Sequence, residues 1–511
     1  MRSSKAFYNT FWGLVYEVVV LISGFVLPRL ILTSFGSNYN GVTSAITQFL
    51  QVVVLFQAGI GGVTIAALYK PLGERNTEQI SVIIKTTESF LRKVVLIFLG
   101  LTFLIAIGYP FLVREDFDWF FTASLVIIMS LSTFAQYFFG QTYQFLLQAD
   151  QRQRVLYIVN SLKVIASTGI AAWMIYMGFG IRAVKLGSAV VFVIAPLFIY
   201  FYTRKRFKIL PNVKKDNSVL KQRWDNFGTQ IAGFVVKNTD LVVLSVFSNV
   251  YEISVYSIYN MITNGIFAMF SPFVNGVAAA FGSMIAKNEH ELIQKNLRLY
   301  EQLVFMLATL LFGVSAATIL PFVHIYVKGV TDVNYNRPAF AYIFIAATFF
   351  QAIRYPYAGI TQAAGHFKPM RNPAFIEAGL NIGISVALVI KFGIVGVIIG
   401  TLFAYVYRTI RYAVYLSRVV VMRNIMIFVK RIILSVVCIL IIFVIARVLP
   451  LPVAKNYKIW ILNTAFISFI ALILTVSVEL LFYRNDFTGF IKMLKNIFTK
   501  RKRIKTTNKE K

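Results

Sequence analysis

The sequence is poor in the residues that carry most protein chemistry near neutral pH. Of its 511 residues, one is cysteine, three are histidine and only 20 are acidic, against 51 that are basic. The single cysteine, Cys438, excludes intramolecular disulfides, CxxC redox chemistry and thiolate metal sites. Three histidines cannot build a histidine cluster, and the chain contains neither an HExxH helix nor a glycine-rich phosphate loop. The composition therefore argues against an enzyme and predicts no cofactor.

Charged residues make up only 14% of the chain, whereas 58% are hydrophobic and the mean hydropathy is +0.72. Apolar runs of about 20 residues, the length that a bilayer core demands, recur along almost the whole sequence. The first run, 11–33, is too long for a signal peptide and no small-residue cleavage site follows it. We therefore predict an all-α polytopic membrane protein of about 14 transmembrane helices, at 11–33, 42–69, 94–113, 120–147, 155–177, 181–203, 224–247, 253–283, 299–327, 338–363, 372–390, 393–417, 431–449 and 459–483.

Lysine and arginine lie mostly on one side of these spans. Eight occur in the connection 204–223 and ten in the tail from Arg484, whereas the opposite connections hold only a few. By the positive-inside rule this asymmetry predicts that both termini are cytoplasmic. Apolar residues recur at helical spacing between lysines in 487–498, which is typical of a helix on an anionic membrane surface. The net charge of +31 thus indicates membrane lipids as partners and not nucleic acid.

The two halves of the chain match each other at an offset of about 213 residues. Gln148-Ala149 matches Gln362-Ala363, and Gly187 matches Gly400. A repeat of six spans preserves orientation, so the halves are expected to be parallel copies around a central cleft. We predict an N-terminal six-helix lobe (1–203), a basic cytoplasmic linker (204–223), a C-terminal six-helix lobe (224–417), two appended helices (418–483) and a basic amphipathic tail (484–511).

The segment FGSNYNGVTSAITQFLQVVVLFQAGIGGVTIAALYKPL (35–72) resembles the Wzx-type polysaccharide-biosynthesis membrane proteins, which flip lipid-linked oligosaccharides. The resemblance includes the Gly41 turn, the Gly59-Ile60-Gly61 break, the Gln148 and Gln362 turns and the Asn-Thr-Asp of the seventh span. It identifies the chain as a member of the multidrug/oligosaccharidyl-lipid/polysaccharide superfamily. It implies alternating-access transport of an undecaprenyl-pyrophosphate sugar from the inner to the outer leaflet of the bacterial cytoplasmic membrane, in O-antigen or capsule export. Glycosyltransferases and a glycan polymerase are the partners that it implies.

Charges inside the spans are the candidate site residues, because each costs at least about 2.5–3.5 kcal/mol at the centre of a bilayer. Cations exceed acids among them, as a cavity for a pyrophosphate head group requires. We predict that Lys237 and Asp240, three residues apart, share one face of the helix 224–247 and line a wet cavity between the lobes. The cations predicted to bind substrate are Lys237, Arg354, Lys163, Arg29 and Lys185.

Three acids, Asp240, Glu17 and Glu377, are predicted to couple transport to Na⁺ or H⁺, if the transport is coupled at all. Other interpretations remain open for several charges. Arg29 and Lys185 lie near span ends, where long side chains reach the surface, and Glu377 lies about a turn into its helix. The deeper charges could form buried structural pairs, such as Lys237 with Asp240.

Two other functions fit parts of the pattern. A cation-coupled multidrug antiporter of the same superfamily would need an anionic cavity, which the cationic excess disfavours. A membrane glycan polymerase or ligase would need a sizeable external loop, whereas every predicted external loop is short.

Overall fold

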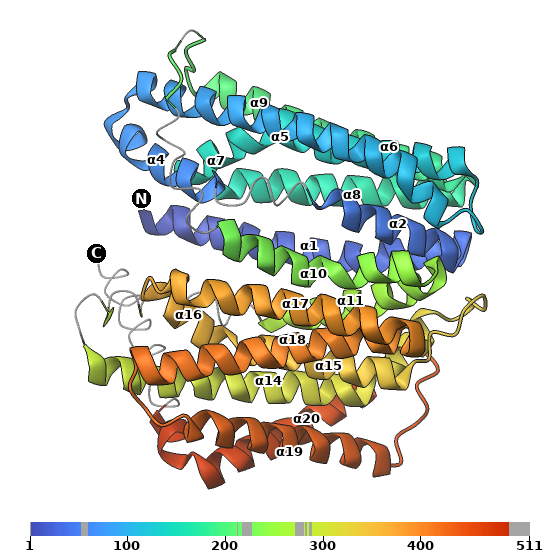
Figure 1. Cartoon of the computed structure of the whole chain (residues 1–511), viewed down its shortest axis with the longest axis vertical. Coiled ribbons are helices and arrows are strands. Elements are labelled where there is room, and N and C mark those ends of the chain that lie inside the picture. Colours follow the sequence, from blue (N-terminus) through green and yellow to red (C-terminus); the bar gives the residue numbers. More distant parts are fainter. Residues whose placement is uncertain are drawn as a thin grey trace, which may run out of the picture. The chain divides into compact units, whose positions relative to one another are not determined.

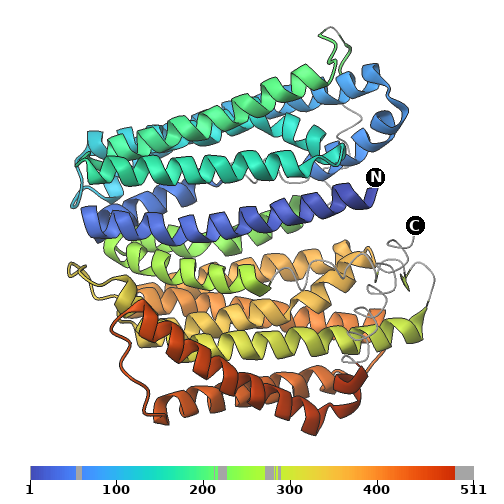
Figure 2. The same cartoon turned by 180° about the vertical axis from the view of Figure 1, so that it is seen from behind.

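The structure, a computed structural model, describes residues 2–52, 60–211, 213–216, 227–270, 281, 284–285 and 289–489. In these residues the chain is helical and contains no strand, which confirms the all-α prediction (Figures 1 and 2). The Gly59 break, residues 217–223 of the expected linker and the tail beyond Gly489 lie outside the described residues.

Ten helices in the described part of the chain are long and apolar enough to cross a bilayer. They coincide with ten of the expected spans, from Phe11–Phe35 to Tyr457–Phe482. Each of the other four expected spans contains one or two shorter helices, which are α2 (Ser37–Leu50) with α4 (Ile60–Glu74), α10 (Phe227–Phe247), α11 (Val250–Phe270), and α15 (Pro338–Ile353) with α16 (Tyr355–Ala363). The protein is a multi-pass membrane protein.

The chain divides into two compact units, the first of which comprises Met1–Met261, Gly329–Asn334 and Val386–Val397. Within it α1 packs along α8, α8 on α9, α5 on α6, and α6 on α9. Besides α2, α4, α10 and part of α11, this unit contains α1 (Arg2–Phe35), α5 (Thr77–Leu112), α6 (Trp119–Ala135), the π-helical turn η1 (Gln136–Gly140), α7 (Gln141–Ala149), α8 (Gln153–Tyr176) and α9 (Ile181–Arg206).

The second unit comprises Ile262–Lys328, Tyr335–Ser385 and Ile398–Lys511. The long helix α14 is its central element, since α15, α19 and α20 all pack against it. Besides α15 and α16, its helices are α14 (His290–Tyr326), most of α17 (Phe367–Phe392), α18 (Ile394–Tyr415), the π-helical turn η3 (Leu416–Val420), α19 (Met426–Val448) and α20 (Tyr457–Phe482).

The repeat expected from sequence is visible in the helix bounds. Adding 214 to the bounds of α5 (77–112) gives 291–326, and α14 is His290–Tyr326. Adding 214 to those of α7 (141–149) gives 355–363, the bounds of α16. The interruptions before α7 and α16 are also equivalent, because Gly140 and Arg354 are 214 positions apart.

The first unit contains a polar seam between α2 and two helices of the expected C-terminal lobe, α10 and α11. The Asn40 amide donates to the hydroxyls of Ser254 and Ser257, both at 2.9 Å, and the Gln48 amide donates to Asn238. Gly41 lies beside Val250 so closely that a Cβ atom would collide with its carbonyl oxygen. Only glycine therefore permits this approach of α2 to α11.

Candidate substrate-binding site

The two charges of α10 lie in different environments. Asp240 is 3% exposed and accepts a hydrogen bond of 2.8 Å from the Tyr256 hydroxyl of α11. Lys237 is exposed. Three residues along an α-helix leave two side chains about 60° apart, and here one of them is buried against α11 whereas the other is exposed. Of the two residues predicted to share one face of α10, Asp240 is therefore buried and Lys237 is exposed.

The other site residues predicted in the first unit come from α1, α8 and α9. The Lys163 ammonium lies 4.9 Å from the centroid of the Phe192 ring, a cation–π distance. Lys163, Arg29 and Lys185 are half-buried, and Glu17 is exposed.

In the second unit, Arg354 and Glu377 form a buried ion pair. Arg354 follows α15 at a break in the helix, where Pro356 at the start of the next helix cannot donate a backbone hydrogen bond. Its Nη1 lies 2.6 Å from Oε1 of Glu377 on α17. The Glu377 residue is 5% exposed. Two residues expected to act separately, one on substrate and one on a coupling ion, are therefore in direct contact.

The same carboxylate has a second arginine partner, Arg408 of α18. Its Nε lies 3.5 Å from Glu377 Oε2, its Nη1 donates to the Met370 carbonyl at 2.9 Å, and its Nη2 donates to the Tyr412 hydroxyl at 3.1 Å. Arg408 is 3% exposed. Arg408 is not among the residues predicted from the sequence, although an arginine inside the apolar run 393–417 is the same signal that selected Arg354.

Arg354, Arg408 and Glu377, here called the arginine cluster, carry two positive charges and one negative charge. A buried charge needs compensation by a partner. One carboxylate neutralises one guanidinium, so the cluster keeps a net positive charge. Arg354 is the more accessible arginine, with 18% of its side chain exposed, and its guanidinium carbon lies 5.5 Å from the centre of the Tyr405 ring. Planar guanidinium donors of this kind fit phosphate oxygens.

A second buried charge cluster joins α14 to α19 and α20. Arg423 binds the Glu301 carboxylate through both terminal nitrogens, and Arg431 bridges Gln302 at 3.0 Å and Asp486 at 3.2 Å. Gln302 donates in turn to the carboxylate of Glu479, which also belongs to this cluster. Here three carboxylates face two arginines, so positive charge is not in excess. This cluster cross-links helices and lacks the character of an anion site.

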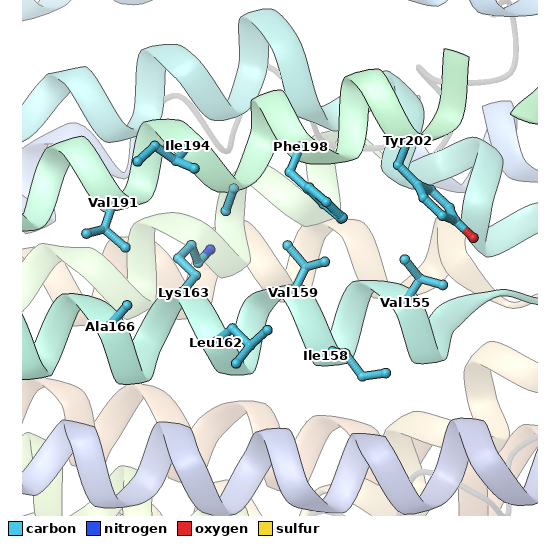
Figure 3. Close-up of a pocket in the computed structure, with 11 residues that line it drawn as sticks. Val155, Ile158, Val159, Leu162, Lys163, Ala166, Val191, Ile194, Phe198 and Tyr202 are labelled. Carbon is cyan, nitrogen blue, oxygen red and sulfur yellow. The ribbon is translucent and has the colours of Figure 1, made fainter. Parts of the chain in front are cut away.

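A groove lies between α8 and α9 in the first unit (Figure 3). Its volume is about 490 Å³, within the range of ligand pockets. Lys163 is the one charged residue among those that line it, and its side chain extends from α8 toward α9 (Figure 3). The lining residues are Val155, Ile158, Val159, Leu162, Lys163, Ala166, Val191, Ile194, Ala195, Phe198 and Tyr202.

Solved structures of membrane transporters share this fold. The lipid II flippase MurJ in an inward closed conformation aligns with a TM-score of 0.71 at 16% identity, covering 93% of this chain and 99% of its own. A mutant form of the Vibrio cholerae MATE transporter VcmN aligns with a TM-score of 0.57 at 13% identity, covering 83% and 98%. An inward-facing multidrug-resistance MATE transporter of the MOP superfamily aligns with a TM-score of 0.54 at 13% identity, covering 80% and 93%. No family model and no curated protein sequence matches the chain.

These likenesses establish the fold, which this chain shares with a lipid II flippase and with MATE transporters, one of them described as a member of the MOP superfamily that the sequence resembles. Of the three structures, the flippase matches over more of both chains than either multidrug transporter does.

Proposed function

We propose that the protein is a flippase that moves an undecaprenyl-pyrophosphate-linked oligosaccharide from the cytoplasmic to the outer leaflet of the bacterial cytoplasmic membrane. The observation that carries this proposal is the arginine cluster, which keeps a net positive charge at a buried position in a transporter fold. A drug-cation antiporter would be hindered by such a charge, since it would repel a cationic substrate.

The pyrophosphate is the part of the substrate that these residues would recognise. Arg354 offers a planar set of donors and is the more exposed of the two arginines, so within the cluster it would contact the pyrophosphate before Arg408 does. Glu377 would hold both guanidinium groups in place when the site is empty. Lys237, which is exposed, would add a point charge during passage.

The transport cycle would be alternating access between the two six-helix lobes, 1–203 and 224–417, with both termini in the cytoplasm. Superfamilies built from parallel repeats move their halves against each other around a site near the midplane. Coupling to Na⁺ or H⁺ would use Asp240 or Glu17. Glu377 would take part in coupling only if protonation or ion binding released its arginines.

The test uses a strain that lacks the gene and accumulates the lipid-linked sugar in the inner leaflet. Surface glycan and accumulated lipid-linked sugar are measured after complementation with wild type, Arg354→Gln, Arg408→Gln or Lys237→Ala. Charged hydrogen bonds contribute enough that losing one should lower export at least about tenfold. The double variant Arg354→Gln with Glu377→Gln strands no carboxylate and leaves Arg408 as the remaining charge of the cluster, and it should also fail to export because the Arg354 contact is lost.

Arg447→Gln is the matched control, because this exposed arginine of α19 donates to the Tyr342 hydroxyl at 2.8 Å outside the cluster. It should export normally. Membrane levels and thermal stability are measured for every variant, so that a folding defect is recognised. Normal export by stable Arg354→Gln and Arg408→Gln proteins would refute the proposed site. Drug resistance on overexpression, without glycan export, would favour the antiporter.

A further inference from the structure

The groove between α8 and α9 is built from one apolar stripe on each helix. On α8 its lining residues recur at helical spacing from Val155 to Ala166, and on α9 from Val191 to Tyr202 (Figure 3). At 1.5 Å per residue, the α8 stripe is about 16 Å long. This is about half of the 30 Å hydrocarbon core of a bilayer. The groove therefore has the length of a lipid chain that lies within one leaflet.

Basic residues stand at the end of this groove where α8 begins and α9 ends, which is the predicted cytoplasmic end. Arg154 lies one turn before Ile158 on α8, and Arg206 lies one turn after Tyr202 on α9, so both extend the lining stripes. Both are exposed. An apolar channel that begins between two arginines is complementary to a lipid with an anionic head group and a long hydrocarbon chain.

The internal repeat relates the lining of the groove to the arginine cluster. The members of the arginine cluster in the second unit correspond to small or differently charged residues in the first. At an offset of 214 residues, Glu377 corresponds to Lys163. At an offset of 213 residues, which also relates Gly400 to Gly187, Arg408 corresponds to Ala195. Lys163 and Ala195 both line the groove. The first unit thus has an alanine that lines the groove at the position where the second has an arginine.

We propose that the α8–α9 groove holds the part of the polyprenyl chain nearest the phosphate of the transported lipid, with that phosphate between Arg154 and Arg206 in the loading state. This inference rests on the proposed function and adds the place where the lipid chain is bound. The occupant is a polyprenyl phosphate and not a bulk phospholipid, because of Lys163. A resident phospholipid keeps its phosphate at the membrane surface, so this phosphate cannot pair with the Lys163 ammonium halfway into the membrane. A lipid whose phosphate crosses the membrane brings that phosphate past Lys163.

The experiment is photo-cross-linking of the purified full-length protein in phosphatidylcholine nanodiscs. The probe is a polyprenyl phosphate with a diazirine on one of the isoprene units next to the phosphate, and the comparison probe is a phosphatidylglycerol with a diazirine in one acyl chain. We expect the polyprenyl probe to label peptides of α8 and α9, with competition by unlabelled polyprenyl phosphate. Labelling should exceed that by the phospholipid probe about tenfold, as a contribution of 1.4 kcal/mol produces.

Two variants fill the groove, Ala166→Trp and Leu162→Trp, both at exposed lining positions. Ile165→Trp adds the same side chain in the same turn of α8 at an exposed position outside the lining. Labelling should fall about tenfold in the first two and stay unchanged in the third. At the mouth, Arg154→Gln with Arg206→Gln should reduce labelling, whereas Lys205→Gln, at the neighbouring exposed position, should not.

Equal labelling of the groove by the phospholipid probe, without competition by polyprenyl phosphate, would overturn the inference. So would unchanged labelling in both groove-filling variants. Labelling does not require transport, so its outcome is separate from that of the export assay. A protein that binds the probe in the groove but exports no glycan would contradict the proposed function alone.

Discussion

At the scale of single residues, the arginine cluster depends on one carboxylate. Glu377 lies 2.6 Å from Arg354 and 3.5 Å from Arg408, and all three side chains are largely buried. Two guanidinium groups held this close would repel each other if the carboxylate were lost. The cluster is therefore both a source of positive charge and a weak point of the second unit.

Replacing Glu377 by glutamine should destabilise the protein. Breaking a buried ion pair by removing one partner costs about 3–5 kcal/mol, because the remaining charge is left uncompensated. Thermal unfolding in detergent should show a lower midpoint for Glu377→Gln. In the exposed pair Lys70–Glu74, the charged atoms are 3.9 Å apart, and the control Glu74→Gln should cost less than about 1 kcal/mol. Equal midpoints for the two variants would contradict this account of the cluster.

At the scale of helices, close approach at small residues decides how elements pack. Gly140 precedes α7 and leaves no space for a side chain, because a Cβ atom would lie 2.8 Å from Pro196 Cβ. Its repeat counterpart is Arg354, so the same break in the helix holds a charged residue in the second unit. The two halves of the repeat share the positions of the helices but carry different residues at the breaks between them.

Gly41→Ala tests the helix contact in the first unit. The added Cβ meets the Val250 carbonyl, so α2 and α11 must separate. Overpacking of this kind costs about 1–3 kcal/mol. Gly62→Ala in α4 is the control, since nothing lies within 4 Å of a Cβ atom there. Alanine at that helical position should be neutral or stabilise by up to about 1 kcal/mol. We expect a lower unfolding midpoint only for Gly41→Ala, and an unchanged midpoint would rule out the close contact.

At the scale of the whole molecule, the distribution of basic residues predicts how the chain is oriented in the membrane. Basic residues end α9 at Arg204, Lys205 and Arg206, whereas the connection between α19 and α20 holds only Lys455 before α20 begins. This orientation can be tested directly, because Cys438 is the only native cysteine and is buried.

Cysteine labelling should separate the two sides. In a Cys438→Ser background, an impermeant maleimide applied to intact cells should label Lys455→Cys. It should label Lys205→Cys only after the membrane is permeabilised, because the positive-inside rule places that end in the cytoplasm. Both positions are exposed, so differences in burial do not explain the result. The reverse pattern would invert the topology and the direction of the proposed transport.

The helices and the repeat were predictable, whereas the pairing of charges was not. Apolar runs of membrane length specify helices by themselves, and Gln148 and Gln362 already give the repeat offset. From the sequence, Arg354 and Glu377 are separate candidates and Arg408 is not a candidate. Lys237 and Asp240 are predicted to lie together, although only Asp240 is buried. Which charges meet depends on the rotation of each helix about its axis, and a single sequence contains no direct signal of that rotation.

Local hydropathy alone determined the class of this protein, because the bilayer requires about 20 apolar residues for every crossing and backbone hydrogen bonds that are satisfied within the helix. Only tertiary packing decided the chemistry of its interior. Arg354, Glu377 and Arg408 lie on three separate stretches of chain, and they become one site because the helices that carry them pack around a single carboxylate. The same packing leaves the α8–α9 groove open where Ala195 stands in place of an arginine.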